Sequence, residues 1–149
     1  MAILPAYQFG GGEPPIIESA VSGSKFSRGC VLQFVGSKVS KQNTVGAALG
    51  SADLGAVALC SSQDSINGLI PVQIIAQDDV FFADVAGGGT YVRGGEYDLL
   101  DSGGETNATT SSNTARLVCV KSTDEVLGQS NASRILVKFI AHSGVVDLT

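Results

Sequence analysis

Residues 134–141 read Arg-Ile-Leu-Val-Lys-Phe-Ile-Ala. This stretch combines apolar–polar alternation with a continuous apolar run, which is typical of a β-strand buried on most of both faces. A second stretch of this kind spans 115–121, and shorter ones lie at 30–35, 69–76 and 80–83. Gly, Ser, Asn and Asp, which favour turns, separate them. The pattern therefore predicts a protein built from short strands.

No segment shows the 3.6-residue apolar stripe of an amphipathic helix over a window long enough to form one. The nearest candidate, residues 45–59, contains Gly46, Gly50 and Gly55, and each glycine costs a helix interior about 1 kcal/mol. We therefore expect at most one short helix. Short strands without helices between them predict an all-β fold, either a small antiparallel barrel or a sandwich.

Two segments between the strands carry further expectations. Gly94-Gly95 stands between residues 91–93 and residues 96–100, and this arrangement predicts a hairpin with a two-glycine turn. Residues 101–114 contain no large apolar side chain. Such a polar tract cannot offset its ordering entropy by burying surface, so it predicts a long exposed loop.

The chain has 149 residues, a length that predicts one compact unit. It is 44% apolar with a mean hydropathy of +0.25, which is too apolar for global disorder. The formal charge of −5 and the pI near 4.6 offer no basic face for nucleic acid. No apolar run is long enough to span a bilayer, and the first residues lack a secretory pattern. We expect synthesis in a cytoplasm and neither nucleic acid nor membrane as a partner.

Residues 1–20 differ in composition from residues 21–149, which we expect to form a β-rich body. Pro5, Gly10–Gly12 and Pro14–Pro15 interrupt regular structure. The same segment carries large apolar residues: Leu4, Tyr7, Phe9, Ile16 and Ile17. An extended arm that cannot bury such side chains on itself predicts contact with another molecule. An arm folded back over its own domain is the equal alternative.

Candidate catalytic groups are few. His142 is the only histidine, and Ser143 and Asp147 follow it, but adjacent residues on a strand point to opposite faces. The chain also lacks a Gly-x-Ser-x-Gly turn, which argues against a serine triad. Nothing beside the cysteines predicts the electropositive pocket that Cys–His catalysis needs. Gly87-Gly88-Gly89-Thr90 precedes a predicted strand rather than a helix, which favours a flexible turn over a phosphate loop.

Cys30, Cys60 and Cys119 are odd in number and contain no Cys-x-x-Cys pair, so we expect small buried thiols in a reducing compartment. Without a secretory pattern, the sequons at Asn107 and Asn131 are chance matches. Several aspartates offer oxygen ligands but form no calcium-loop pattern, and they are typical of strand ends. These are Asp78, Asp79, Asp84, Asp98 and Asp101. We expect no catalytic residue, no cofactor and no metal.

Several stretches together have a familiar pattern. Residues 26–32 open the body with a strand after a glycine, and residues 46–50 and 54–59 are rich in small residues. Residues 125–128, a polar turn and residues 134–139 close it. Over roughly residues 20 to 141, the chain resembles the small head decoration (cement) proteins of tailed bacteriophages. It departs from them in its polar segment 101–114 and in residues 1–20.

The resemblance implies a virion structural protein, without enzymatic activity, on the outer surface of an icosahedral capsid. It further implies a homotrimer at local three-fold positions that clamps the major capsid protein against internal pressure. The apolar residues of segment 1–20 are then the expected capsid or subunit contacts. One alternative is a carbohydrate- or receptor-binding β-domain displayed on a virion, although the chain has no tryptophan. Another is a small hydrolase built around His142.

Overall fold

The computed structural model describes residues 2–7, 15–21, 25–41, 55–75, 79–85, 90–102, 105–109, 117–121 and 134–139. Within them the chain forms strands and one 3₁₀ turn, η2. These elements are β1 (Ile3–Tyr7), β2 (Ile16–Val21), β3 (Val31–Val35), β4 (Lys38–Lys41), β5 (Ala56–Ala58), η2 (Ser62–Asp64), β6 (Leu69–Ile74), β7 (Val80–Asp84), β8 (Glu96–Ser102), β9 (Glu105–Thr109), β10 (Leu117–Lys121) and β11 (Arg134–Phe139). The prediction of an all-β fold is confirmed, and η2 is the one helical turn among the residues described.

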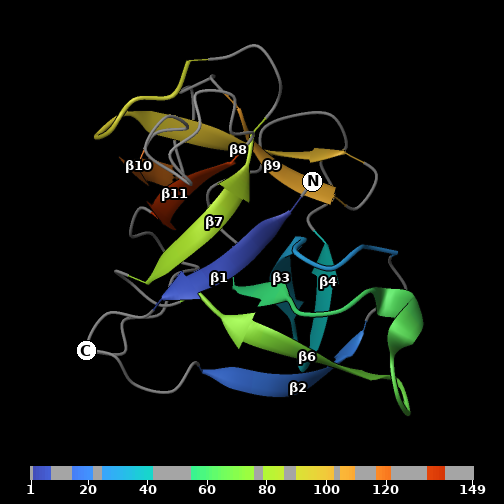
Figure 1. Ribbon diagram of the computed structural model, residues 1–149. Helices are drawn as coiled ribbons and strands as arrows, with labels where there is room; N and C mark the ends of the chain where they lie inside the picture. Colours follow the sequence, from blue (N-terminus) through green and yellow to red (C-terminus); the bar gives the residue numbers. More distant parts are fainter. Residues whose placement is uncertain are drawn as a thin grey trace.

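The strands form two layers. One is a closed barrel with the order β2-β4-β3-β5-β6, and the other is a six-stranded sheet with the order β1-β7-β11-β10-β8-β9. Figure 1 shows the sheet in the upper part of the molecule and the barrel below it. The named strands pair antiparallel, as expected, except that a parallel pair of β2 with β4 closes the barrel.

Alternation along the strands of the barrel wall produces two cores. Leu32 and Ala58 point into the barrel, whereas their neighbours Val31 and Val57 point outward into the core beneath the six-stranded sheet. All four side chains are almost completely buried. The sheet contributes its inner face to the second core, where Phe81 and Phe139 pack edge to face. The wall is therefore buried on both faces at Val31–Leu32 of β3 and along β5, whereas Phe34 further along β3 is exposed.

The described part of residues 1–20 belongs to these two layers. β1 pairs antiparallel with β7, and β2 pairs with β4 and β6 inside the barrel. Ile3 is fully buried in the core beneath the sheet. Segment 1–20 is therefore not a separate arm where it is described. The folded-back alternative describes it, because its strands find hydrogen-bonding partners within the same chain.

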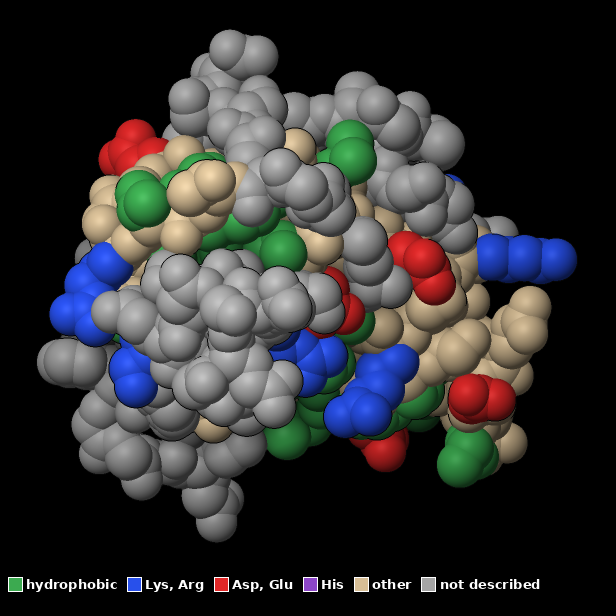
Figure 2. All heavy atoms as spheres, turned by 45° about the horizontal axis from the view of Figure 1, so that its top comes forward, with side chains coloured by type: hydrophobic (Ala, Val, Ile, Leu, Met, Phe, Trp, Pro, Cys, Tyr) green, Lys and Arg blue, Asp and Glu red, His purple; other side chains and the backbone are tan. Residues whose placement is uncertain are grey.

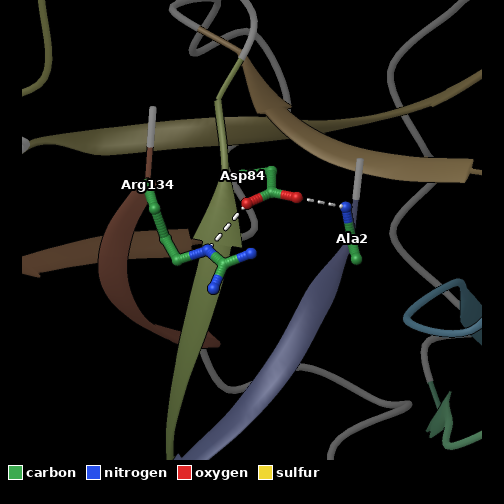
Figure 3. A network of polar contacts seen from close by, with 3 residues as sticks. All are labelled: Ala2, Asp84 and Arg134. Atoms are coloured by element: carbon green, nitrogen blue, oxygen red, sulfur yellow. Dashed lines mark hydrogen bonds and ion pairs between the residues drawn. The ribbon is translucent and has the colours of Figure 1, made fainter. Parts of the chain in front are cut away.

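Polar contacts fix the start of β1 against both layers. The Asp84 carboxylate accepts hydrogen bonds from the Ala2 backbone N–H at 2.9 Å and from the Arg134 Nε at 2.8 Å (Figure 3). The Ile3 N–H donates to the Gly29 carbonyl, and the Gly29 N–H donates to the Ala58 carbonyl of the barrel. The first residues of β1 thus join β7 and β11 of the sheet to the barrel.

The hairpin predicted around Gly94-Gly95 does not form, although a turn is present. The Gly95 N–H donates to the Val92 carbonyl, but residues 91–93 are not a strand. Instead, the Gly94 N–H donates to the Cys119 carbonyl of β10, and the Gly95 carbonyl accepts the Cys119 N–H. The Tyr97 ring packs on Gly95, where an added Cβ would lie 2.6 Å from its hydroxyl oxygen. The hydroxyl of Tyr97 accepts a hydrogen bond from the Val92 N–H, so this N–H bonds to a side chain and not to the backbone of a paired strand.

The prediction of a long exposed loop at 101–114 is wrong for residues 101–102 and 105–109. They lie in β8 and β9, which pair antiparallel with Ser102 opposite Glu105. Thr106 and Asn107 of β9 are buried despite their polarity. The Thr106 hydroxyl accepts the Val31 N–H at 3.0 Å, and the Asn107 side-chain amide donates to the Ala108 carbonyl. Hydrogen bonds within the protein therefore offset the loss of water around these groups.

Replacement of Gly29 by Ala is expected to destabilise the protein by about 3 kcal/mol. Gly29 has φ +85°, and an added Cβ would collide with Ala2, so backbone strain of about 1–2 kcal/mol adds to overpacking of similar size. Gly36 is the matched control, because its φ is +60° but nothing lies within 4 Å of the added Cβ. Gly36→Ala should cost only the strain. Equal losses in urea-unfolding free energy would contradict the close approach of Ala2 and Gly29.

Replacement of Thr106 by Val should expose the role of its hydroxyl as the partner of the β3 backbone. The variant keeps the side-chain volume but leaves the buried Val31 N–H without an acceptor, which costs about 1–3 kcal/mol. Amide hydrogen exchange at Val31 should accelerate in Thr106→Val, whereas Thr106→Ser should retain protection there. Equal exchange rates of the Val31 amide in the two variants would contradict the hydrogen bond from the Val31 N–H to the Thr106 hydroxyl.

Candidate functional site

The predicted contact residues do not form one cluster in the described parts of the chain. Leu4 lies on β1 opposite Phe82 and is partly buried in the six-stranded sheet. Tyr7 ends β1, and Phe9 lies outside the described residues. Ile16 and Ile17 are adjacent on β2 of the barrel, where they are 48% and 40% exposed. Adjacent residues of a strand point to opposite faces, so these two exposed side chains lie on different sides of β2 and do not form one surface.

An exposed apolar surface extends from Ile16 across the outside of the barrel. Ser19 of β2 is buried, so Ile16 and Glu18 point to the outer side of the strand by alternation. Glu18 pairs with Pro71 of β6, and Ala20 pairs with Leu69. Side chains of directly paired residues lie on the same face of a sheet.

A tight turn adds one more apolar residue to this surface. Ile66 and Leu69 exchange both backbone hydrogen bonds at 3.0 Å across Asn67 and Gly68. Asn67 has φ 54° and Gly68 has φ 77°, the left-handed pair typical of a two-residue type I′ hairpin. Ile66 is therefore held beside Leu69 although it is 76% exposed. We call the surface formed by Ile16, Glu18, Ile66, Leu69 and Pro71 the β2–β6 face.

The β2–β6 face contains an open pocket of about 360 Å³. Apolar side chains and two carboxylates line it together with Cys60 and Asn67. The lining residues are Glu18, Cys60, Asp64, Ile66, Asn67, Leu69 and Pro71. Apolar surface that stays exposed on a folded protein often marks a site of protein contact. The arrangement can hold an apolar group beside a positive charge, and it offers no activated nucleophile.

Cys60 is the one cysteine of this pocket, and its thiol is held neutral. Burial raises the pKa of Cys60, and the negative charge of Asp64 raises it further. The thiol, rather than the thiolate, therefore dominates at neutral pH, and the thiol is a poor nucleophile. Cys30 and Cys119 are buried in the two cores, and none of the three cysteines forms a disulfide.

Ile66 and Leu69 were missed by the sequence analysis, although a signal for them exists. The Asn67-Gly68 pair predicts a two-residue hairpin, in which the two flanking residues face each other on one side. Both flanking residues are apolar, and this turn precedes a strand whose next residue, Ile70, is buried. Alternation then places Leu69, and with it Ile66, on the exposed side.

The other sequence candidates are scattered or fall outside the described residues. His142, Ser143, Asp147 and the three glycines 87–89 lie outside them, as do Asp78 and Asn131, while Thr90 is exposed. Asp84 pairs with Arg134, whereas Asp79 and Asp98 are buried. Among the described residues no group of three His, Cys, Asp or Glu side chains could hold a metal ion. Asn107 is 4% exposed, so its sequon is closed to modification in the folded protein.

Comparisons with known proteins assign no relatives. No family model matches the chain, and no curated protein matches it significantly. In the described segments, no helix has the length and apolar character needed to cross a membrane. Acidic and basic side chains are interspersed on the molecular face seen in Figure 2. The described side chains visible there form no broad patch of a single charge.

Thiol labelling should test the environment of Cys60. Native protein should react at Cys60 with a maleimide more slowly at pH 8 than a free cysteine does, because its raised pKa lowers the thiolate fraction. Asp64→Asn removes one cause of the shift, so the pH–rate profile should move to lower pH. Cys60→Ser should remove most of the labelling of the native protein, since Cys30 and Cys119 are buried and react more slowly than Cys60. A profile unchanged by Asp64→Asn would contradict the effect of that carboxylate.

Proposed function

We propose that the protein is a virion structural protein that binds the outer surface of an icosahedral phage capsid and clamps its major capsid proteins. The observation that carries the proposal is the β2–β6 face, where Ile16, Ile66 and Leu69 remain exposed on a well-packed body. Apolar side chains held outward on rigid strands suit adhesion to another protein. The likeness to decoration proteins in residues 26–32, 54–59 and 134–139 supports the same class.

The architecture supports a passive mechanical role. A closed barrel has no free strand edges, and the sheet is packed onto the barrel wall through a continuous core. Such a body adheres without large rearrangement, so little of the contact energy is lost to ordering. On a shell with many equivalent positions, a modest contact at each position adds to the strength of the whole lattice.

The contact mode differs from an arm that adds a strand to its neighbour. The outward-facing Ile3 N–H of β1 already donates to Gly29, and Pro5, two residues later on the same edge, has no N–H. We therefore propose side-chain contacts from Ile16, extended by Ile66 and Leu69 on the same β2–β6 face. The net charge of −5 favours a position away from packaged DNA, and a homotrimer at local three-fold positions belongs to the same proposal.

Cosedimentation with purified phage heads tests this function. The intact protein should bind heads of its own phage saturably, with a fixed number of copies per capsid. Ile16→Ser should raise the dissociation constant about tenfold, which corresponds to a loss of about 1.4 kcal/mol in binding free energy. Val92→Ser is the matched control, because Val92 is 53% exposed outside the β2–β6 face. Failure of the unmodified protein to bind heads would overturn the proposal. Saturable binding to glycans instead of heads would favour a carbohydrate- or receptor-binding domain.

A further inference from the structure

We propose that the β2–β6 face receives a lysine or arginine side chain carried on an apolar segment of the partner protein. This inference rests on the proposed function and specifies the chemistry of its contact. It follows from the combination of apolar walls with two carboxylates, Glu18 and Asp64, in one open pocket. Long basic side chains match such a site because they bury an aliphatic stem while keeping a charged end.

The two carboxylates lack a cationic partner within the described residues. Neither Glu18 nor Asp64 takes part in an ion pair there, in contrast to Asp84, which pairs with Arg134 at 2.8 Å. Lys38 of β4 pairs with Ala20 and lies on the outer side of the barrel, but it does not line the pocket. The negative charge of Asp64 reaches the pocket, since it raises the pKa of Cys60 there.

The backbone under Asp64 is fixed before any partner binds. The Asp64 N–H donates to the Ser61 carbonyl, and the Ser61 hydroxyl caps η2 by accepting the Gln63 N–H. Ser62 ties the turn to the barrel, because its N–H donates to the Phe26 carbonyl and its hydroxyl accepts the Phe26 N–H, both at 3.0 Å. A carboxylate on a fixed turn loses little freedom on pairing, which favours a specific contact.

The apolar wall is fixed by different contacts. The type I′ hairpin holds Ile66 and Leu69 beside each other, and Pro71 follows on β6 opposite Glu18. A segment with apolar residues flanking one basic residue would place apolar groups against Ile66 and Leu69 and its charge against Glu18 and Asp64. Two carboxylates alone offer too few oxygen ligands for a calcium site, so a basic side chain fits the site better than a bare cation.

Head-binding assays with charge variants test the inference in the setting of the proposed function. The double variant Glu18→Gln with Asp64→Asn should bind heads about fivefold more weakly, because two exposed ion pairs each contribute modestly. Its binding should also depend less on NaCl concentration than that of the unmodified protein. Ile66→Ser should weaken binding as well. Lys38→Gln is the matched control of opposite charge, and it should leave binding unchanged or slightly tighter.

A peptide titration separates this inference from the proposed function. Acetyl-Leu-Lys-Leu-amide at millimolar concentration should shift the backbone amide resonances of Ile66, Asn67 and Leu69, and acetyl-Leu-Glu-Leu-amide should not. If the unmodified protein does not bind heads but shows these shifts, the proposed function is wrong and the proposed binding of a basic side chain at the β2–β6 face is supported. If the unmodified protein binds heads and the dissociation constants of the charge and Ile66 variants are within twofold of its own, the proposed function is supported and the proposed binding of a basic side chain is wrong. Peptide shifts that are absent or equal for the two peptides also overturn the site.

Discussion

Burial of the barrel wall on both faces is the constraint on which the rest of the structure depends. Val31 and Leu32 are neighbours on β3, yet they enter different cores. The same division separates Val57 from Ala58 on β5. Because a side chain changes face at every residue, a shift of one position in either strand would exchange the contents of the two cores. The wall therefore fixes the register of the barrel and the position of the sheet above it.

The first described residues of the chain connect the six-stranded sheet to the barrel wall. Gly29 lies where the turn before β3 meets β1, and its backbone bonds both Ile3 and Ala58. A side chain at this position would fill the space that Ala2 occupies. Residues 2–7 and 15–20 of the segment predicted as an arm are therefore part of the fold, held by backbone hydrogen bonds that hydropathy does not reveal.

Sequence patterns predict the strands in this protein better than they predict its polar parts. Apolar alternation locates β3, β6, β7, β10 and β11, because hydrophobic burial determines them directly. It fails for β9, whose Thr106 and Asn107 are buried with hydrogen-bond partners from the protein itself. The prediction pairs residues 96–100 with residues 91–93, whereas β8 pairs with β9 and β10 instead. Local sequence does not show which neighbouring segment becomes the partner strand.

The same physical difference explains why composition draws attention to Ile16 of the candidate site but not to Ile66 and Leu69. These two residues are placed together on the outside of the barrel by a turn. The outer side of the barrel is covered by the sheet at Val31 and Val57, and Gln73 of β6 is buried beside Val57, whereas Glu18 and Leu69 further along β2 and β6 are exposed. Because β2 and β6 pair with each other along residues 16–20, a partner that lies on the outer face of these two strands contacts side chains there. In the proposed contact, the position of Glu18 and Asp64 among apolar residues would favour a partner that presents a basic side chain.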